Sequence, residues 1–174
     1  RGKLANSEIV STVMCNLGFS IAMKEQGFEM VQTAVGDRYV LEAMREHGYS
    51  IGGEQSGHMI LLDHNSTGDG LMTACQFLAA VIRSGKPVAE AIQVMEKMPQ
   101  TLINVRVNDK HAVEGSAEVA AAVAAAEEAL GEDGRVLLRP SGTEPVVRVM
   151  VEAVDPAAAQ AHAEAIAAVV EACA

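Results

Sequence analysis

A short segment near the carboxyl end of the chain, Arg139 to Pro145, contains residue types that suit phosphate binding. Hydroxyl groups at Ser141 and Thr143, with successive backbone N–H groups around Gly142, offer a concave set of hydrogen-bond donors. Apolar runs flank the segment and predict strands, so we expect these donors at the end of a hairpin. The pattern therefore predicts an anion site carried by a sheet.

Two arginines can be placed relative to this hairpin end. The flanking strands are predicted at 135–139 and 146–152. If they form a simple antiparallel hairpin, Arg139 lies opposite Val146, and Arg148 is its diagonal neighbour on the same face. Two guanidinium groups on one face can grip a phosphate dianion through bidentate hydrogen bonds. The alternative is an ordinary Pro/Gly turn with two surface arginines paired to nearby acids.

A second candidate site is the glycine-rich segment 53–58. If this segment is extended, Glu54 and Ser56 occupy alternate positions, so that their side chains point the same way and can bind vicinal sugar hydroxyls. The flanking glycines let the backbone approach a ligand closely. The alternative is an ordinary glycine-rich turn with solvated side chains, in which His58 is satisfied locally rather than by a ligand.

A third candidate lies where a predicted strand meets a predicted helix, at Asp37 and Arg38. In α/β sheets, ligands gather where the carboxyl ends of strands meet the starts of helices. The alternative explains Asp37 as the N-cap of the helix and Arg38 as a surface residue. The segment 66–70 is likewise explained by a capped helix start.

The elements that position these segments fall into two groups. In the first, short apolar strands alternate with amphipathic helices, which is typical of an α/β domain. The expected strands are 8–14, 29–35, 50–51 and 59–62. The expected helices are 16–25, 37–47, 71–82 and 87–95.

The second group begins after Pro99. Residues 102–108 alternate between apolar and polar side chains, as does a strand with one wet face. The elements expected after it are a helix at 116–130, strands at 135–139 and 146–152, and a final helix from Asp155. The chain is therefore predicted to be an α/β domain at 1–98, with a mixed, mostly parallel sheet and flanking helices, followed by a small α+β C-terminal domain at 99–174.

Composition excludes several classes of partner. The 174 residues include 13 basic and 23 acidic side chains, and the net charge of −10 argues against binding to nucleic acid or an anionic membrane. Hydrophobic residues make up 49% of the chain, enough for a packed core, but no apolar run approaches the ~20 residues that span a bilayer. The three separated cysteines and the scattered histidines predict neither disulfides nor a metal site. We expect a cytoplasmic protein.

Taken together and in this order, four segments resemble the α-D-phosphohexomutase superfamily over essentially the whole chain. They are Val35 to Val40, Gly52 to His58, Ser66 to Gly70, and Arg139 to Pro145 with Arg148. The resemblance implies a protein of four domains around a deep cleft. This chain, which opens on Arg1 rather than Met, would supply most of the third domain, without its leading helix, and all of the fourth.

The resemblance also implies roles for individual residues. Those implied to bind or neighbour the sugar are Asp37, Arg38, Glu54, Ser56 and His58. Those implied to hold the phosphate that is not being transferred are Arg139, Ser141, Gly142, Thr143 and Arg148.

The implied reaction is the interconversion of glucosamine 6-phosphate and glucosamine 1-phosphate, through a phosphoserine and a bisphosphorylated sugar, with Mg²⁺ held by an aspartate-rich loop. This sequence contains neither the serine loop nor the metal loop. We therefore expect no catalytic and no metal-binding residue in this chain, and no activity from it alone. The expected partners are a hexosamine phosphate and the N-terminal domains of the same protein. The alternatives are a phosphomannomutase or phosphoglucomutase relative, and a non-catalytic module that binds sugar phosphates.

Overall fold

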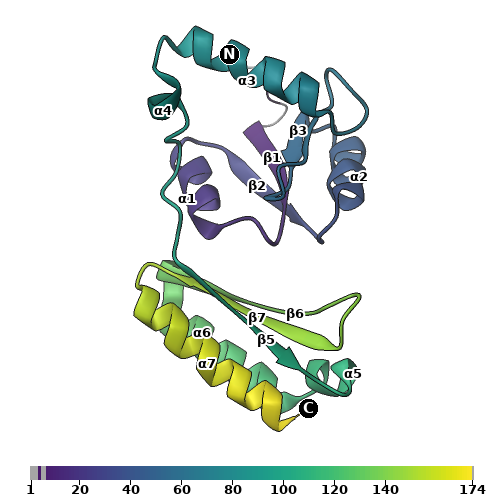
Figure 1. Ribbon diagram of the computed structural model, residues 1–174, viewed down its shortest axis with the longest axis vertical. Helices are drawn as coiled ribbons and strands as arrows, with labels where there is room; N and C mark the ends of the chain where they lie inside the picture. Colours follow the sequence, from purple (N-terminus) through teal and green to yellow (C-terminus); the bar gives the residue numbers. More distant parts are fainter. Residues whose placement is uncertain (1–3, 5–6, 174) are drawn as a thin grey trace. The chain divides into compact units, whose positions relative to one another are not determined.

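The computed structural model describes Leu4 and residues 7–173, with the backbone alone at residues 110 and 111. The chain divides into two compact units, Arg1–Lys97 and Met98–Ala174 (Figure 1). No helix in the described part of the chain has the length and apolar character needed to cross a bilayer.

The first unit is an α/β domain, as the alternating pattern predicted. Its strands are β1 (Glu8–Thr12), β2 (Glu29–Thr33), β3 (Ile51–Gly53) and β4 (Met59–Leu61). Its helices are α1 (Leu17–Glu25), α2 (Asp37–His47), α3 (Gly70–Ser84) and α4 (Val88–Ala91). The sheet has the order β2-β1-β3-β4, in which β1 is parallel to β2 and to β3, and only β4 is antiparallel to its neighbour. The mixed, mostly parallel sheet is therefore confirmed.

Helix starts in this unit follow local side-chain chemistry in two cases and depart from it in a third. The Asn16 side chain accepts a hydrogen bond from the Gly18 N–H at the start of α1, and Asp69 Oδ1 accepts one from the Met72 N–H at 2.9 Å at the start of α3. The expectation that Asp37 caps α2 is wrong. The N-cap is Gly36, whose φ of 132° is open to glycine but strained for other residues, and Asp37 is already the first helical residue.

The core of the first unit lies between the sheet and α2. Its buried members are Val10, Val40, Met44, Tyr49 and Ile60. Helix α3 differs, because none of its residues is buried and its apolar stripe is open. Leu71 and Ile82 are each 78% exposed. The predicted helix is present, but within the described residues its apolar stripe packs against no core.

This difference predicts unequal effects of truncation. Met44→Ala removes a fully buried side chain and should lower the free energy of unfolding by about 2–5 kcal/mol. Ile82→Ala truncates a side chain that is 78% exposed and should change it by less than about 0.5 kcal/mol. Urea unfolding followed by circular dichroism measures both. Equal losses would contradict the open position of α3.

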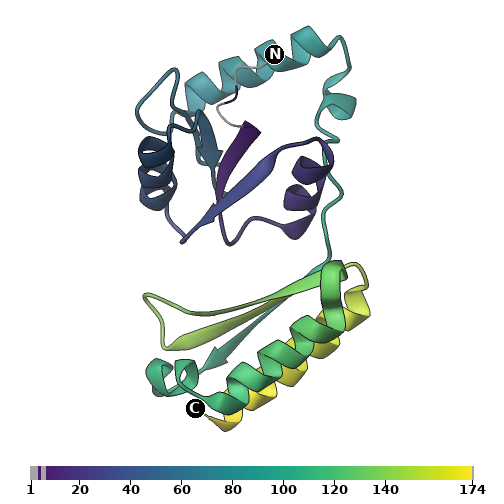
Figure 2. The same ribbon diagram turned by 180° about the vertical axis from the view of Figure 1, so that it is seen from behind.

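The second unit is a small α+β domain, as predicted. Its strands are β5 (Gln100–Arg106), β6 (Gly134–Pro140) and β7 (Val146–Ala153). Its helices are α5 (Lys110–Glu114), α6 (Ala117–Leu130), the short 3-10 helix η2 (Gly131–Asp133) and α7 (Pro156–Ala172). The sheet has the antiparallel order β5-β7-β6, and α6 and α7 lie together on one of its faces (Figure 2). Neither α5 nor η2 was predicted from the sequence, because each is shorter than two turns.

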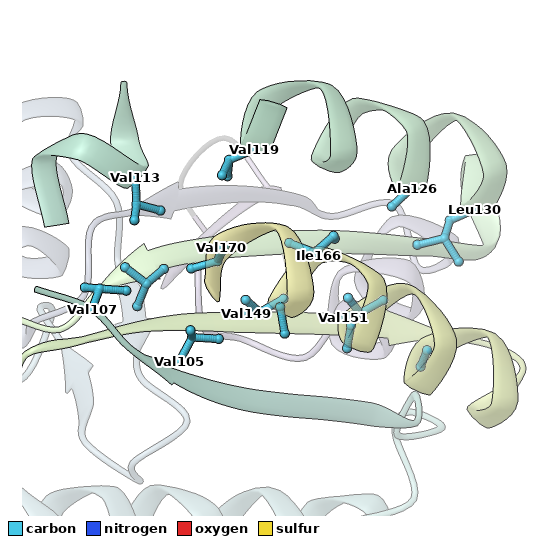
Figure 3. Close-up of a cluster of buried hydrophobic side chains, with 14 of the residues drawn as sticks. Val105, Val107, Val113, Val119, Ala126, Leu130, Val149, Val151, Ile166 and Val170 are labelled. Atoms are coloured by element: carbon cyan, nitrogen blue, oxygen red, sulfur yellow. The ribbon is translucent and has the colours of Figure 1, made fainter. Parts of the chain in front are cut away.

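The sheet of the second unit has one face packed against helices and one face free of them. Val105 on β5 and Val107 just after β5 are buried, and so are Val149 and Val151 on β7. These side chains pack with those of α6 and α7 in one core (Figure 3). Asn104 and its polar neighbours on β5 are exposed, which confirms the predicted alternation. The second face is called here the helix-free face. It carries Gln100, Leu102, Asn104, Arg106, Arg135, Leu137, Arg139, Val146, Arg148, Met150 and Glu152.

Candidate functional site

The hairpin between β6 and β7 places two arginines directly opposite each other. Arg139 pairs with Arg148, so the predicted pairing of Arg139 with Val146 is wrong. The reason is that Pro140 extends β6 and pairs with Val147, and the Ser141 N–H then closes the loop by donating to the Val146 carbonyl at 2.9 Å. Residues directly opposite in an antiparallel pair share a face, with Cβ atoms ~5 Å apart. The two guanidinium groups therefore belong to the helix-free face and are closer than the diagonal pairing predicted.

The arginine side chains present their terminal nitrogens rather than Nε. Among the described residues, Nε of Arg139 and Nε of Arg148 are inaccessible to solvent and have no hydrogen-bond partner. Arg148 Nη2 pairs with Glu144 Oε2 at 3.0 Å, and the Arg148 side chain is 32% exposed. In this conformation, the Nε atoms are closed to a ligand, and only the terminal Nη groups of the two arginines could contact an anion.

The loop 141–145 adds the remaining predicted donors. Ser141 is buried, and its Oγ accepts a hydrogen bond from the Glu144 N–H at 3.3 Å, so this hydroxyl also holds the loop in shape. Gly142 and Thr143 are exposed. A Cβ at Gly142 would meet no atom within 4 Å, so the fold does not demand glycine there. Its absence of a side chain leaves the loop backbone open to a ligand.

In the first unit, Glu54 joins two of the predicted segments. Its Oε1 accepts a hydrogen bond from the Gly36 N–H at 2.9 Å, which ties the segment after β3 to the start of α2. His58 Nε2 lies 3.7 Å from Asp37 Oδ2 and makes a second link between the same segments. The topology therefore gathers these residues at one edge of the sheet, as the position of strand ends and helix starts predicted.

The segment 53–58 is a turn rather than an extended strand, so one premise of the sequence argument is wrong. The Gly57 N–H donates to the Glu54 carbonyl at 3.0 Å, and the Glu54 N–H donates to the His58 carbonyl at 2.9 Å. These bonds close the hairpin between β3 and β4. The strand β3 is only three residues long and ends at Gly53, so the residues after it belong to the turn. Ser56 is exposed on the turn, and its alignment with Glu54 does not follow from strand alternation.

The segment 66–70 packs against the imidazole of His58. A Cβ at Gly68 would overlap the His58 ring, so only glycine allows this close approach. Arg45 Nη2 donates to the Ser66 carbonyl at 3.3 Å and holds the segment from the other side. A hollow of about 370 Å³ lies between the two segments, lined by residues 56–59 and 68–70.

Arg38 points elsewhere in this structure. Its Nε pairs with Glu42 Oε1 at 2.8 Å along the surface of α2, and its side chain is 77% exposed. The guanidinium also lies 5.8 Å from the centre of the Tyr39 ring. These contacts agree with the surface alternative for Arg38, whereas its neighbour Asp37 faces His58.

The carboxylates of this unit do not form a metal site. Within the part of the chain that the structure describes, no three His, Cys, Asp or Glu side chains are grouped so as to hold a metal ion. Asp69 is occupied as a helix cap and also accepts a hydrogen bond from Asn65 at 3.1 Å. The described residues thus do not fit Mg²⁺.

Comparison with known proteins follows the division into two units. Residues 1–98 match the alpha/beta/alpha domain III of phosphoglucomutase/phosphomannomutase, and residues 102–169 match the C-terminal domain of the same family. The chain belongs to the phosphohexomutase superfamily. The predicted resemblance is therefore confirmed over both units.

Curated relatives of this superfamily match almost the whole chain. A phosphoglucosamine mutase of Frankia alni is 57% identical over 172 residues, which are 99% of this chain and 38% of the relative. A phosphoglucosamine mutase of Thermobifida fusca is 60% identical over 167 residues, 96% of this chain and 37% of the relative. The chain thus spans less than two fifths of the length of these relatives.

Solved structures share the fold at lower identity. An N-acetylphosphoglucosamine mutase of Aspergillus fumigatus matches with a TM-score of 0.82 at 19% identity, covering 95% of this chain and 38% of that one. A phosphoglucomutase/phosphomannomutase family protein of Burkholderia thailandensis matches with a TM-score of 0.74 at 25% identity, covering 95% and 37%.

The cap at Asp69 predicts a pH dependence. The Met72 N–H, more than any other group, lowers the pKa of Asp69 below its ordinary value of 3.8. A carboxyl whose pKa falls on folding stabilises the fold above its unfolded pKa, and this contribution is lost as the pH drops through the folded pKa. The urea midpoint of the unaltered chain should therefore exceed that of Asp69→Asn at pH 6, and the difference should shrink below pH 3.8.

Asp63→Asn, which neutralises an exposed carboxylate in the same loop, is the matched control. A difference between the unaltered chain and Asp69→Asn that stays constant from pH 6 to about pH 2 would contradict the role of the Asp69 charge.

Proposed function

We propose that this chain supplies the sugar-binding and phosphate-binding segments of a phosphosugar mutase that interconverts glucosamine 6-phosphate and glucosamine 1-phosphate. The observation that carries the proposal is the Arg139–Arg148 pair, two cations directly opposite on one face beside a loop rich in donors. The relatives in Frankia alni and Thermobifida fusca, both phosphoglucosamine mutases, support the choice of amino sugar.

The second unit, Met98–Ala174, acts as the phosphate clamp in this proposal. Terminal nitrogens of Arg139 and Arg148 donate charge-assisted hydrogen bonds to phosphate oxygens, which are stronger than bonds between neutral groups. Ser141, Thr143 and the backbone at Gly142 add neutral donors. Because Arg148 is paired with Glu144 in the ligand-free chain, the phosphate has to share this guanidinium with the carboxylate or displace it.

The first unit, Arg1–Lys97, positions the sugar in this proposal. The Gly36 N–H holds Glu54 Oε1, which orients the carboxylate so that Oε2 can accept from a sugar hydroxyl. Ser56 contributes an exposed hydroxyl from the same turn. His58 and Asp37 face each other and orient the turn. Arg38 leaves its surface partner Glu42 and contacts the sugar instead.

The transferred phosphoryl group is supplied from outside these residues in this proposal. A phosphoserine elsewhere in the longer protein donates it and yields a bisphosphorylated sugar, and Mg²⁺ is held by an aspartate-rich loop there. Magnesium and GlcNAc-6P accompany the related Aspergillus fumigatus enzyme in one of its structures. The contribution of the present chain is to hold and orient, which is a large part of phosphoryl-transfer catalysis.

The identity of the sugar distinguishes this proposal from a second candidate function. Both matched family models are named for phosphoglucomutase and phosphomannomutase, so a mutase for glucose or mannose phosphates is the alternative. Assays of the full-length protein with glucosamine, glucose and mannose 6-phosphates decide between them. Turnover at least tenfold faster with glucosamine 6-phosphate supports the proposal, and a preference for either neutral sugar overturns it.

Removing either clamp arginine should weaken phosphate binding. Arg139→Ala and Arg148→Ala should each cost about 1.5–3 kcal/mol in binding of glucosamine 6-phosphate, the range for hydrogen bonds to charged groups. Titration followed by nuclear magnetic resonance measures the affinity of the 174-residue chain. Arg83→Ala, which removes an exposed cation from the end of α3, is the control. Unaltered affinity in either clamp variant rules out a direct contact from that arginine.

The chain alone should not turn over substrate. Incubation of the purified 174 residues with glucosamine 6-phosphate, a bisphosphorylated sugar and Mg²⁺ should yield no glucosamine 1-phosphate, because the serine loop that accepts and donates the phosphoryl group is absent from these residues. A coupled assay for glucosamine 1-phosphate measures this, with the full-length protein as the positive control. Turnover by the purified chain would show that it contains its own phosphoryl donor.

A further inference from the structure

We propose that the anion site extends onto the third strand of the second unit, where Arg106 of β5 acts as a third phosphate-contacting cation. The inference rests on the proposed phosphate clamp and adds a residue that the sequence motif does not include. Its basis is the register of the three strands and the charges that this register brings together.

The register places one row of polar side chains across all three strands. Arg148 on the central strand β7 lies directly opposite Arg139 on β6 and directly opposite Asn104 on β5. Because directly opposite residues share a face, all three belong to the helix-free face. The β5 side of Arg148 thus meets a neutral amide, and no carboxylate directly opposite it neutralises its charge.

Arg106 is the next residue after Asn104 on the same face of β5, on the side of the loop. It pairs with Val146, which makes it the diagonal neighbour of Arg148 at ~7–8 Å between backbones. The Val107 N–H donates to the Pro145 carbonyl at 3.0 Å and fastens the end of β5 to the end of the phosphate loop. Arg148 Nη2 turns toward the same end, since it pairs with Glu144 of that loop.

Charge balance supports a role for the third cation. The chain carries 23 acidic and 13 basic side chains, yet three arginines gather at one hairpin end. Glu144 supplies one negative charge to this group. A phosphate dianion would supply the two that remain, so the group is neutral only with the dianion bound and with Arg106 counted.

The neighbours of Arg106 on the strand are buried, whereas its own side chain is exposed and can be approached by a ligand. The neighbours Val105 and Val107 are 2% and 3% exposed and anchor the strand in the core, while the Arg106 side chain is exposed. Its removal should leave the fold intact, because exposed substitutions outside caps and turns change stability little.

The test compares four forms of the 174-residue chain. Inorganic phosphate and glucosamine 6-phosphate are titrated into the unaltered chain, Arg106→Ala, Arg106→Lys and the control Arg83→Ala, at low salt and at 0.5 M NaCl. Circular dichroism and thermal unfolding confirm that each variant is folded. Arg106→Ala should bind both probes about tenfold more weakly at either salt concentration, as expected for the loss of one charge-assisted contact.

Arg106→Lys should fall between Arg106→Ala and the unaltered chain, because lysine keeps the charge but loses the planar fork. Arg83→Ala should bind as the unaltered chain does. Unaltered affinity of Arg106→Ala overturns the inference while leaving the clamp of Arg139 and Arg148 in place. A deficit that disappears at 0.5 M NaCl also overturns it, because it then reflects only the long-range field. If the unaltered chain binds neither probe, the proposed phosphate site itself fails.

Discussion

Two like charges held directly opposite each other on neighbouring strands are the constraint around which the second unit is organised. Arg139 and Arg148 repel across the β6–β7 pair, which destabilises the sheet in the absence of a counter-charge. The strands cannot relieve the repulsion by a one-residue slip of β7, because such a slip would turn Val147 and Val149 out of the core and Arg148 into it. The packing of the valines therefore keeps both arginines on the other face, where a bound anion would relieve their repulsion.

Glu144 provides only part of that relief. It contacts Arg148 from an exposed loop position, where an ion pair is worth little against solvent screening. A phosphate that bridges both guanidinium groups gains more, since it interacts with two cations already held at the required spacing. In the proposed clamp, the packing of the opposite face would thus set the backbone positions of both arginines before a phosphate binds, which lowers the cost of binding.

The sequence predicted several helix starts that depend on neighbouring residues, though not that of α2, and missed features that depend on distant residues. The caps at Asn16, Ser116 and Asp155 were predictable, because a side chain and an N–H two or three residues later suffice. The hairpin register was not, because it depends on whether Pro140 continues the strand. The amphipathic pattern of α3 predicted a helix, but periodicity contains no information on what covers its apolar stripe.

The two candidate sites are built in different ways, and the difference fits what each would bind. The sugar-side segments are short turns tied to one another by the Glu54–Gly36 bond and by His58 between Asp37 and Gly68. Such links orient individual acceptors, as recognition of separate hydroxyls requires. The proposed clamp instead sets charge on a sheet, and such a site would recognise a phosphate dianion whatever its attachment. A mutase has to hold either phosphate of a bisphosphorylated sugar, and a clamp that depends on charge is indifferent to which one it receives.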